Sequence, residues 1–365
     1  MSSKVLGILG TAKNTGKTTT TSALLEIANN KNLSVGITSI GYDGEDIDNI
    51  TGLPKPRIFA KKGTLIATAK NCLKSGVSQI KTLKETEIST PLGKIIIGEV
   101  MEDGLVIIAG PNKGEEISIV IDKLKKLGNK LILVDGAINR IVPLMNTDAL
   151  ILTTGAARNI NIDFLVKEIQ CICNLFDLPK INKKNLMNLK NVEQKVVTLI
   201  QNDNLKRFLR INSLINLADL LELTSNLDDK TNSIFIPGIL TEFALKELIK
   251  KNIKLSKSKN IIISNPSHLL VGSNPISLFD ILFEMKKSEI KLKVIKTLPI
   301  LAITINPFYP LYRYGNNKYK SAWVDRDKLY NKIKSIVSIP VIDIAREGGN
   351  NLFDIIKKEF NLSQK

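Results

Sequence analysis

The chain has 365 residues, and its 52 Lys and Arg against 35 Asp and Glu give a net charge of +17 at pH 7. This length leaves room for two domains with a sizeable core. No apolar run approaches the about 20 residues that span a bilayer, and residues 5–9 are too short for a signal peptide, so we expect a cytoplasmic protein with no membrane partner. The lysines are scattered along a Lys-, Asn- and Ile-rich chain, which argues against nucleic acid as the reason for the charge.

The cysteines and the histidine are too few for several kinds of site. The three cysteines are Cys72, Cys171 and Cys173, and the one histidine is His268. An odd, sparse set of cysteines does not indicate a disulfide framework. Cys171 and Cys173 are two residues apart in a helical pattern and do not share a face, which disfavours a metal pair. For His268 a structural or solvent-facing role is favoured over a catalytic one.

The most informative segment runs from Gly10 to Thr20, with the sequence GTAKNTGKTTT. It follows an apolar run and precedes a helical pattern from about Lys17 to Asn30, which is the context of a phosphate-binding loop. Backbone N–H groups of such a loop and of the following helix face a polyphosphate. We therefore predict a site for ATP and Mg²⁺. Its predicted nucleotide-binding residues are Gly10, Thr11, Ala12, Lys13, Asn14, Thr15, Gly16, Lys17, Thr18 and Thr19.

This loop departs from the usual pattern in two ways. The usual spacing places the first glycine at Thr11, whereas the glycine here is Gly10, one residue earlier. Lys13 lies four residues before Lys17, and the deviant Walker loops carry their extra lysine one residue earlier than that. An ordinary Gly/Thr-rich turn before a helix is the alternative, but the strand, loop and helix context favours phosphate binding.

Two acidic residues follow predicted strands and could serve the same site. Asp43 comes after a strand at about Leu33–Ile40, and Asp135 ends the apolar run at 130–134 in a Walker B pattern. We predict Lys17, Asp43 and Asp135 as catalytic residues, and Thr18, Asp43 and Asp135 as the residues that hold Mg²⁺. Asp43 could equally be a solvated turn residue, and any buried strand can end in Asp.

Other residues could bind an anion or an aromatic ring. Lys55, Arg57 and Arg140 are candidate contacts for an anionic group, although surface exposure is the commoner fate of such charges. The stretch 306–315 combines aromatic residues with an arginine, and it could stack on a ring ligand or partner. A packed, proline-stiffened loop is the favoured interpretation of that stretch.

The patterns predict an α/β fold: a P-loop parallel sheet flanked by helices, a helical connector and a second α/β domain. We place the nucleotide-binding domain at residues 1–177. It would include a helical run at Leu65–Leu73 and an inserted β-hairpin whose turn is at residues 102–104. Residues 178–231 are interpreted as the helical connector, and 232–365 as the C-terminal α/β domain.

The first about 150 residues resemble the P-loop NTPases that include dethiobiotin synthetase, the Mrp/MinD ATPases and nitrogenase iron protein. The resemblance implies ATP and Mg²⁺ binding and a possible homodimer around nucleotide. More narrowly, segments 10–19, 38–45 and 52–57 resemble the reactivase subunit associated with lysine 5,6-aminomutase. That resemblance implies ATP-driven exchange of inactivated cobalamin on the aminomutase, and only the phosphate-loop residues carry over with a defined role.

Three functional hypotheses follow. The first is an ATPase that acts on a protein partner, with an aminomutase as the partner that the resemblance implies. The second is an ATP-dependent ligase or kinase of the dethiobiotin synthetase type, in which Lys55, Arg57 and Arg140 bind an anionic substrate. The third, supported mainly by the charge, is a DNA-associated ATPase.

Overall fold

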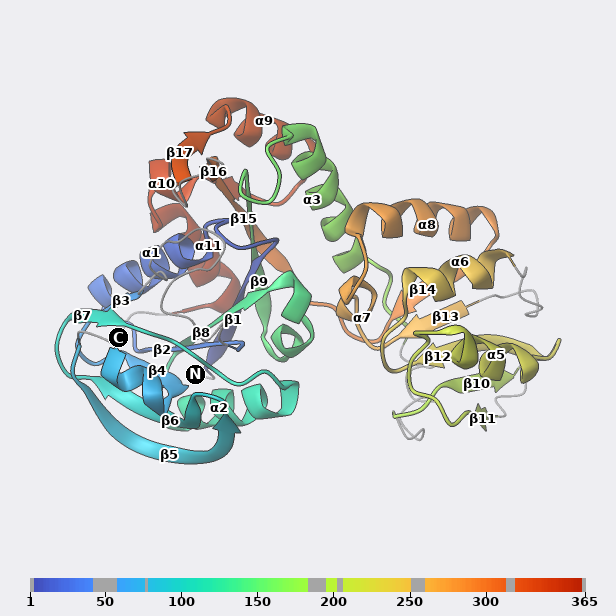
Figure 1. The fold of residues 1–365 in the computed structure, drawn as a ribbon, viewed down its shortest axis with the longest axis horizontal. Helices are drawn as coiled ribbons and strands as arrows, with labels where there is room; N and C mark the ends of the chain where they lie inside the picture. Colours follow the sequence, from blue (N-terminus) through green and yellow to red (C-terminus); the bar gives the residue numbers. More distant parts are fainter. Residues whose placement is uncertain are drawn as a thin grey trace. The chain divides into compact units, whose positions relative to one another are not determined.

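A computed structural model of the chain describes residues 3–41, 58–75, 78–182, 195–201, 206–250, 260–312 and 319–362. The chain forms two compact units, of which the first comprises Met1–Ile169 and Leu298–Lys365 and the second Gln170–Thr297. Figure 1 shows the elements of both units. Within the described residues, no helix is both long enough and apolar enough to cross a membrane.

The first unit is built on a nine-stranded sheet with β1 (Lys4–Gly10) near its centre. In spatial order its strands are β18 (Val341–Ile342), β15 (Ile300–Asn306), β9 (Ala149–Gly155), β1, β8 (Leu131–Ala137), β2 (Val35–Ser39), β4 (Leu65–Ala69), β6 (Gly93–Val100) and β5 (Ile80–Thr90). From β18 to β4 all neighbours are parallel, and β6 and β5 then pair antiparallel. Central parallel strands are covered on both faces, which explains why β1 and β8 are almost continuously apolar.

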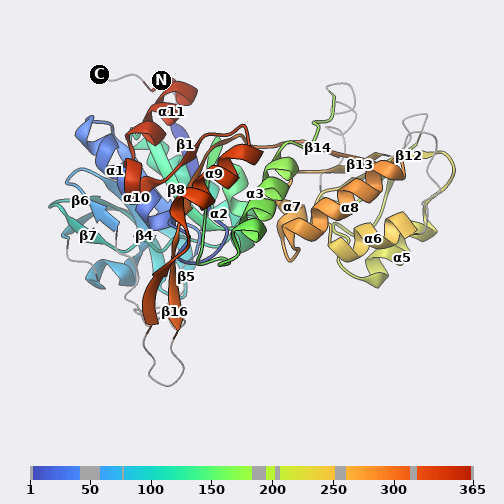
Figure 2. The same ribbon diagram turned by 90° about the horizontal axis from the view of Figure 1, so that it is seen from above.

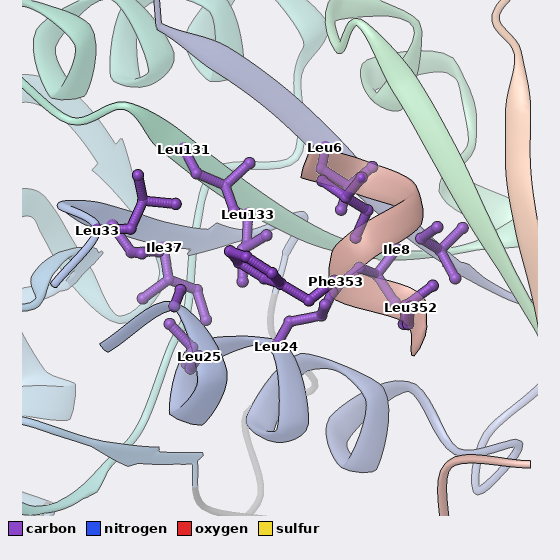
Figure 3. Close-up of a cluster of buried hydrophobic side chains, with 14 of the residues drawn as sticks. Leu6, Ile8, Leu24, Leu25, Leu33, Ile37, Leu131, Leu133, Leu352 and Phe353 are labelled. Atoms are coloured by element: carbon purple, nitrogen blue, oxygen red, sulfur yellow. The ribbon is translucent and has the colours of Figure 1, made fainter. Parts of the chain in front are cut away.

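One face of this sheet is covered by α1 (Lys17–Asn30) and by α11 (Asn350–Phe360) from the other end of the chain. Apolar residues on α11 recur at helical spacing, so the helix presents one apolar stripe. Figure 3 shows Phe353 among side chains of α1, β1 and β8. The opposite face carries α2 (Gly114–Lys126), whose Leu124 lies 3.4 Å from where a Cβ on Gly36 would stand.

The remaining elements of the first unit border this sheet. They are β3 (Ile58–Ala60), paired with β7 (Gly104–Val106), the hairpin of β16 (Phe308–Tyr312) and β17 (Tyr319–Trp323), α9 (Arg326–Ile336), α10 (Ile344–Glu347) and three 3₁₀ turns, Lys70–Ser75, Ile138–Arg140 and Val142–Asn146. Figure 2 shows β16 extending away from the large sheet. Helix α3 (Ile162–Phe176) follows β9.

The second unit contains a five-stranded sheet. Its order is β11 (Lys206–Phe208), β10 (Thr198–Gln201), β12 (Thr231–Ile236), β13 (Asn260–Ile263) and β14 (Lys291–Val294). Strands β12, β13 and β14 pair parallel, whereas β10 pairs antiparallel with both of its neighbours, β12 and β11. Its described helices are α5 (Leu217–Ser225), α6 (Glu242–Lys250), α7 (Ser267–Leu270) and α8 (Pro275–Lys287). Asn216 and Asp219 form a capping box that fixes the start of α5.

The α/β class and the large, mostly parallel sheet are as predicted, but the chain is divided differently. Residues 298–365 do not join a separate C-terminal domain, because β15 and β18 extend the first sheet. The described part of 178–231 is not a purely helical connector, because β10 and β11 pair with β12 inside the second unit. Short apolar runs such as 197–200 do not distinguish a strand from a helix by periodicity.

Two local predictions also fail. Leu65–Leu73 begins with β4, a strand buried between β2 and β6, and continues as a 3₁₀ turn. The hairpin turn is at residues 91–92, between β5 and β6, and not at 102–104. After the turn at residues 102–104 the chain forms β7, which pairs with β3 and therefore lies outside the large sheet.

Candidate functional site

The predicted phosphate loop joins β1 to α1 and is a tight turn. Asn14 and Gly16 have positive φ angles of 60° and 100°. Gly16 adopts this left-handed conformation without strain because it has no Cβ. The Thr15 hydroxyl donates a hydrogen bond to the Ala12 carbonyl oxygen at 2.9 Å, closing the turn on itself.

The N-terminus of α1 is open to a ligand. Lys17, Thr18 and Thr19 occupy its first turn, and the helix has neither a side-chain cap nor an acidic residue in that turn. The Thr20 N–H makes the first backbone bond of the helix, 2.9 Å from the Gly16 oxygen. The preceding N–H groups have no partner within the helix, and their combined dipole attracts an anion.

Lys17 folds back across the end of β1. A Cβ built on Gly10 would lie 2.7 Å from Cγ and 3.0 Å from Nζ of Lys17. Because glycine has no Cβ, position 10 leaves room for the Lys17 side chain to cross the backbone. Thr11, which occupies the usual glycine position, instead continues the pairing of β1 with β9 through its N–H, 3.0 Å from the Thr153 oxygen.

Asp135 near the end of β8 lies beside this loop, in the strand next to β1. Its Oδ1 is inaccessible and has no hydrogen-bond partner among the described residues. Burial raises the pKa of Asp135 to about 6, while Lys17 and the Gly136 N–H act in the opposite direction. An inaccessible carboxylate oxygen without a donor suits a cation or its bound water.

These groups share one cavity of about 730 Å³. It lies at the carboxyl ends of β2, β8, β1, β9 and β15, where ligands of open parallel sheets bind. The predicted residues that line it are Thr11, Ala12, Lys13, Asn14, Gly16, Lys17, Thr18, Thr19 and Asp135. Thr18 and Asp135 supply the oxygen donors that Mg²⁺ prefers, so the residues present fit the predicted ion.

Of the other four charged candidate residues, three lie outside the described residues and one lines the cavity. Asp43, Lys55 and Arg57 lie outside the described residues. Arg140 lines the cavity, and its Nη1 lies 3.4 Å from the Ile40 oxygen and close over Gly41.

The cysteine pair and the histidine that the sequence analysis considered both lie in the second unit. Cys171 and Cys173 are buried and form no disulfide. His268 is half-buried, and burial lowers its pKa. The described ranges contain no cluster of three or more His, Cys, Asp or Glu that could hold a metal.

The sequence prediction missed residues that shape the loop from distant strands. The Asn306 side-chain amide at the end of β15 donates to the Asn14 oxygen at 2.8 Å. Two hydroxyl pairs reinforce this attachment, Thr15 with Thr153 at 3.2 Å and Thr20 with Thr304 at 3.0 Å. Polar residues at the carboxyl ends of apolar strands were the available signal, but their distance from the loop in sequence concealed it.

No protein-family model matches the chain, and no curated protein matches it. A solved structure of pNOB8 ParA bound to nonspecific DNA matches at 16% identity, covering 79% of this chain and 96% of that chain, with a TM-score of 0.24. That ParA is bound to DNA, which goes against our expectation that nucleic acid is not a partner, and we do not retain that expectation. At this identity and TM-score the likeness carries no further argument. The large sheet flanked by helices is itself consistent with a P-loop NTPase fold.

Proposed function

We propose that the chain is an ATP-binding P-loop ATPase that acts on a protein partner. The observation that carries the proposal is a juxtaposition within one cavity. Lys17 and the uncapped N-terminus of α1 provide positive charge, and the inaccessible Oδ1 of Asp135 lacks a donor. A polyphosphate would pair with the positive charge, and its divalent cation would pair with the Asp135 carboxylate.

In this proposal the backbone from Thr11 to Gly16 holds the phosphates and Lys17 neutralises their charge. The Thr18 hydroxyl and the Asp135 carboxylate hold Mg²⁺, with Asp43 as a further acid. A bound Mg²⁺ supplies electrostatic stabilisation of the charge that develops during phosphoryl transfer. The protein residues contribute by orienting the terminal phosphate in a partly enclosed site.

Titration of the full chain with ATP and Mg²⁺ tests the site. Lys17→Ala should weaken binding at least about a hundredfold, since it removes a cation that contacts the phosphates directly. Lys126→Ala, at an exposed position in the last turn of α2, is the matched control and should bind ATP normally. Unchanged ATP affinity in a folded Lys17→Ala variant would disprove the site.

The resemblance to the reactivase supports an aminomutase as the protein partner. ATP turnover should then rise when lysine 5,6-aminomutase carrying inactivated cobalamin is added. If turnover instead rises with an anionic metabolite alone, and Arg140→Gln abolishes that rise, the ligase or kinase alternative is correct. Light scattering with and without ATP tests the proposed nucleotide-dependent homodimer.

DNA is a second candidate partner, favoured by the net charge of +17. Binding through phosphate contacts releases counterions, so affinity should fall steeply and linearly with salt on a logarithmic scale. Fluorescence anisotropy with a random-sequence duplex at several salt concentrations measures that slope. A flat slope, or no binding at low salt, would remove DNA from the candidates.

A further inference from the structure

The order of the strands distinguishes the end of the cavity that would hold the terminal phosphate of a nucleotide from the end that would hold its nucleoside. Along the edge of the sheet the sequence is β2, β8, β1, β9 and β15, and the phosphate loop follows β1 in the middle. Asp135 lies on the β8 side, so the cation and the terminal phosphate of a nucleotide belong there. The nucleoside end must then extend toward β9 and β15. This step rests on the proposed function.

Arg158 lies on that side of the cavity. It follows β9, its N–H donates to the Gly155 oxygen at 2.9 Å, and it lines the cavity together with Asn306 and Phe308. Asn306 is engaged by the loop and by the Phe308 N–H, and Phe308 is apolar. Among the described lining residues that follow β9 and β15, Arg158 therefore carries the positive charge.

A buried carboxylate fixes the position of this arginine. Nε and Nη2 of Arg158 donate to Oε1 of Glu168 at 2.9 and 2.7 Å. Glu168 on α3 is only 1% exposed, and its Oε2 has no partner in the described part of the chain. Burying a carboxylate is costly unless it is paired, so the glutamate depends on this arginine.

The same contact leaves donors for a ligand. A guanidinium has five N–H donors in a rigid planar fork, and the pair with Glu168 uses two of them. The ring of Phe164 lies 5.8 Å from the guanidinium carbon and further restricts the side chain. Arg158 is thus held by α3 and lines the cavity, with three of its five donors outside the pair with Glu168.

We propose that Arg158 binds the nucleoside end of the nucleotide, at the ribose hydroxyl oxygens, and that Glu168 is the residue that positions it. A guanidinium suits this role because its planar fork of N–H donors matches the pair of oxygens of a ribose diol. Lys17 would then bind any polyphosphate, whereas Arg158 would distinguish a nucleotide from a bare polyphosphate.

Comparing ATP with inorganic tripolyphosphate, both with Mg²⁺ and the full chain, tests this division of roles. Arg158→Gln should weaken ATP binding roughly tenfold to a hundredfold, the loss expected for charge-assisted hydrogen bonds. It should leave tripolyphosphate affinity within about twofold, because that ligand lacks the nucleoside end. Arg158→Lys should not restore ATP binding, and Glu168→Gln should cause a smaller loss with the same selectivity for ATP.

Arg326→Gln provides a matched control. Arg326 pairs with the buried Asp343 at 3.3 Å in the same unit, its side chain is 37% exposed against 35% for Arg158, and it does not line the cavity. The control variant should reproduce any general effect of unpairing a buried carboxylate, with the ratio of ATP to tripolyphosphate affinity unchanged. If Arg158→Gln fails to fold, the double variant Arg158→Gln/Glu168→Gln, which removes both charges, is measured instead.

The outcomes separate the two proposals. Equal losses for ATP and tripolyphosphate, or no loss for either, would overturn the role of Arg158 while leaving the phosphate site intact. A wild-type chain that binds neither ligand would overturn the proposed function and this inference with it. A selective loss for ATP in the Arg158 and Glu168 variants alone supports the inference.

Discussion

Replacing Asp135 by Asn should stabilise the ligand-free protein while destroying its response to Mg²⁺. The carboxyl group has an inaccessible oxygen without a partner, and burial raises its pKa from 3.8 to about 6 despite Lys17 nearby. Asn has the same shape and no charge. The variant therefore avoids the cost of ionising a buried acid, and loses the oxygen charge that a cation needs.

The magnitude and its pH dependence follow from the pKa of Asp135. A shift from 3.8 to about 6 corresponds to about 3 kcal/mol at most, at about 1.4 kcal/mol per pKa unit. Between these two pKa values the folded protein holds more protons than the unfolded chain, so the free energy of unfolding falls as pH rises. The penalty is complete above about pH 6 and absent below about pH 4. At pH 5 the advantage of Asp135→Asn should be about half its value at pH 8.

Urea unfolding of both proteins at pH 8 and pH 5, without ligand, measures the effect. Asp122→Asn, at an exposed position on α2, is the control and should change stability by less than about 0.5 kcal/mol. A second series with ATP and Mg²⁺ should stabilise the wild type and not Asp135→Asn. The reasoning is refuted if the variant is less stable than the wild type at pH 8, or if its advantage does not shrink at pH 5.

Three further predictions concern residues that support the site. Asn306→Ala, which removes the bond to the Asn14 oxygen, should lower ATP affinity about tenfold by calorimetry and stability by only about 1 kcal/mol. Phe353→Ala, in the core between α1 and the sheet, should lower the free energy of urea unfolding by about 3–5 kcal/mol. Trp323, the one tryptophan of the chain, packs edge-on against Phe308 of the cavity at 5.9 Å. ATP should therefore change tryptophan fluorescence, and Phe308→Leu should reduce that change.

The parts of the site that the sequence predicted are those encoded by consecutive residues. A short apolar strand, a glycine-bounded turn and the start of a helix occur together between Lys4 and Thr20, and local conformational preferences are enough to fix them. The position of Asp135 was predictable for the same reason, because it directly follows a run of apolar residues in a strand that is buried on both faces. Neither prediction required knowledge of which strands pair.

The parts that sequence did not predict depend on pairing between distant segments. The run at 300–305 has the same local character whether it joins the first sheet or the second, and only packing selects its partner, β9. Leu65–Ala69 combines good helix formers with complete burial, and its position between two strands overrides its helical preference. Asn306 and Arg158 were missed as lining residues of the cavity because their contacts depend on these nonlocal positions.

The shape of the phosphate loop depends on the return of the chain to the first unit. Asn306 fixes the Asn14 carbonyl across 292 residues of sequence, and Thr304 contacts Thr20 from the same strand. These contacts require β15 in its place beside β9, and β15 follows the second unit along the chain. A nucleotide that prefers the completed loop must, by mass action, also stabilise the association of residues 298–362 with the rest of the first unit. Under the proposed function, nucleotide binding and closure of this discontinuous unit are therefore linked equilibria, although the residues proposed to contact phosphate come from one short segment.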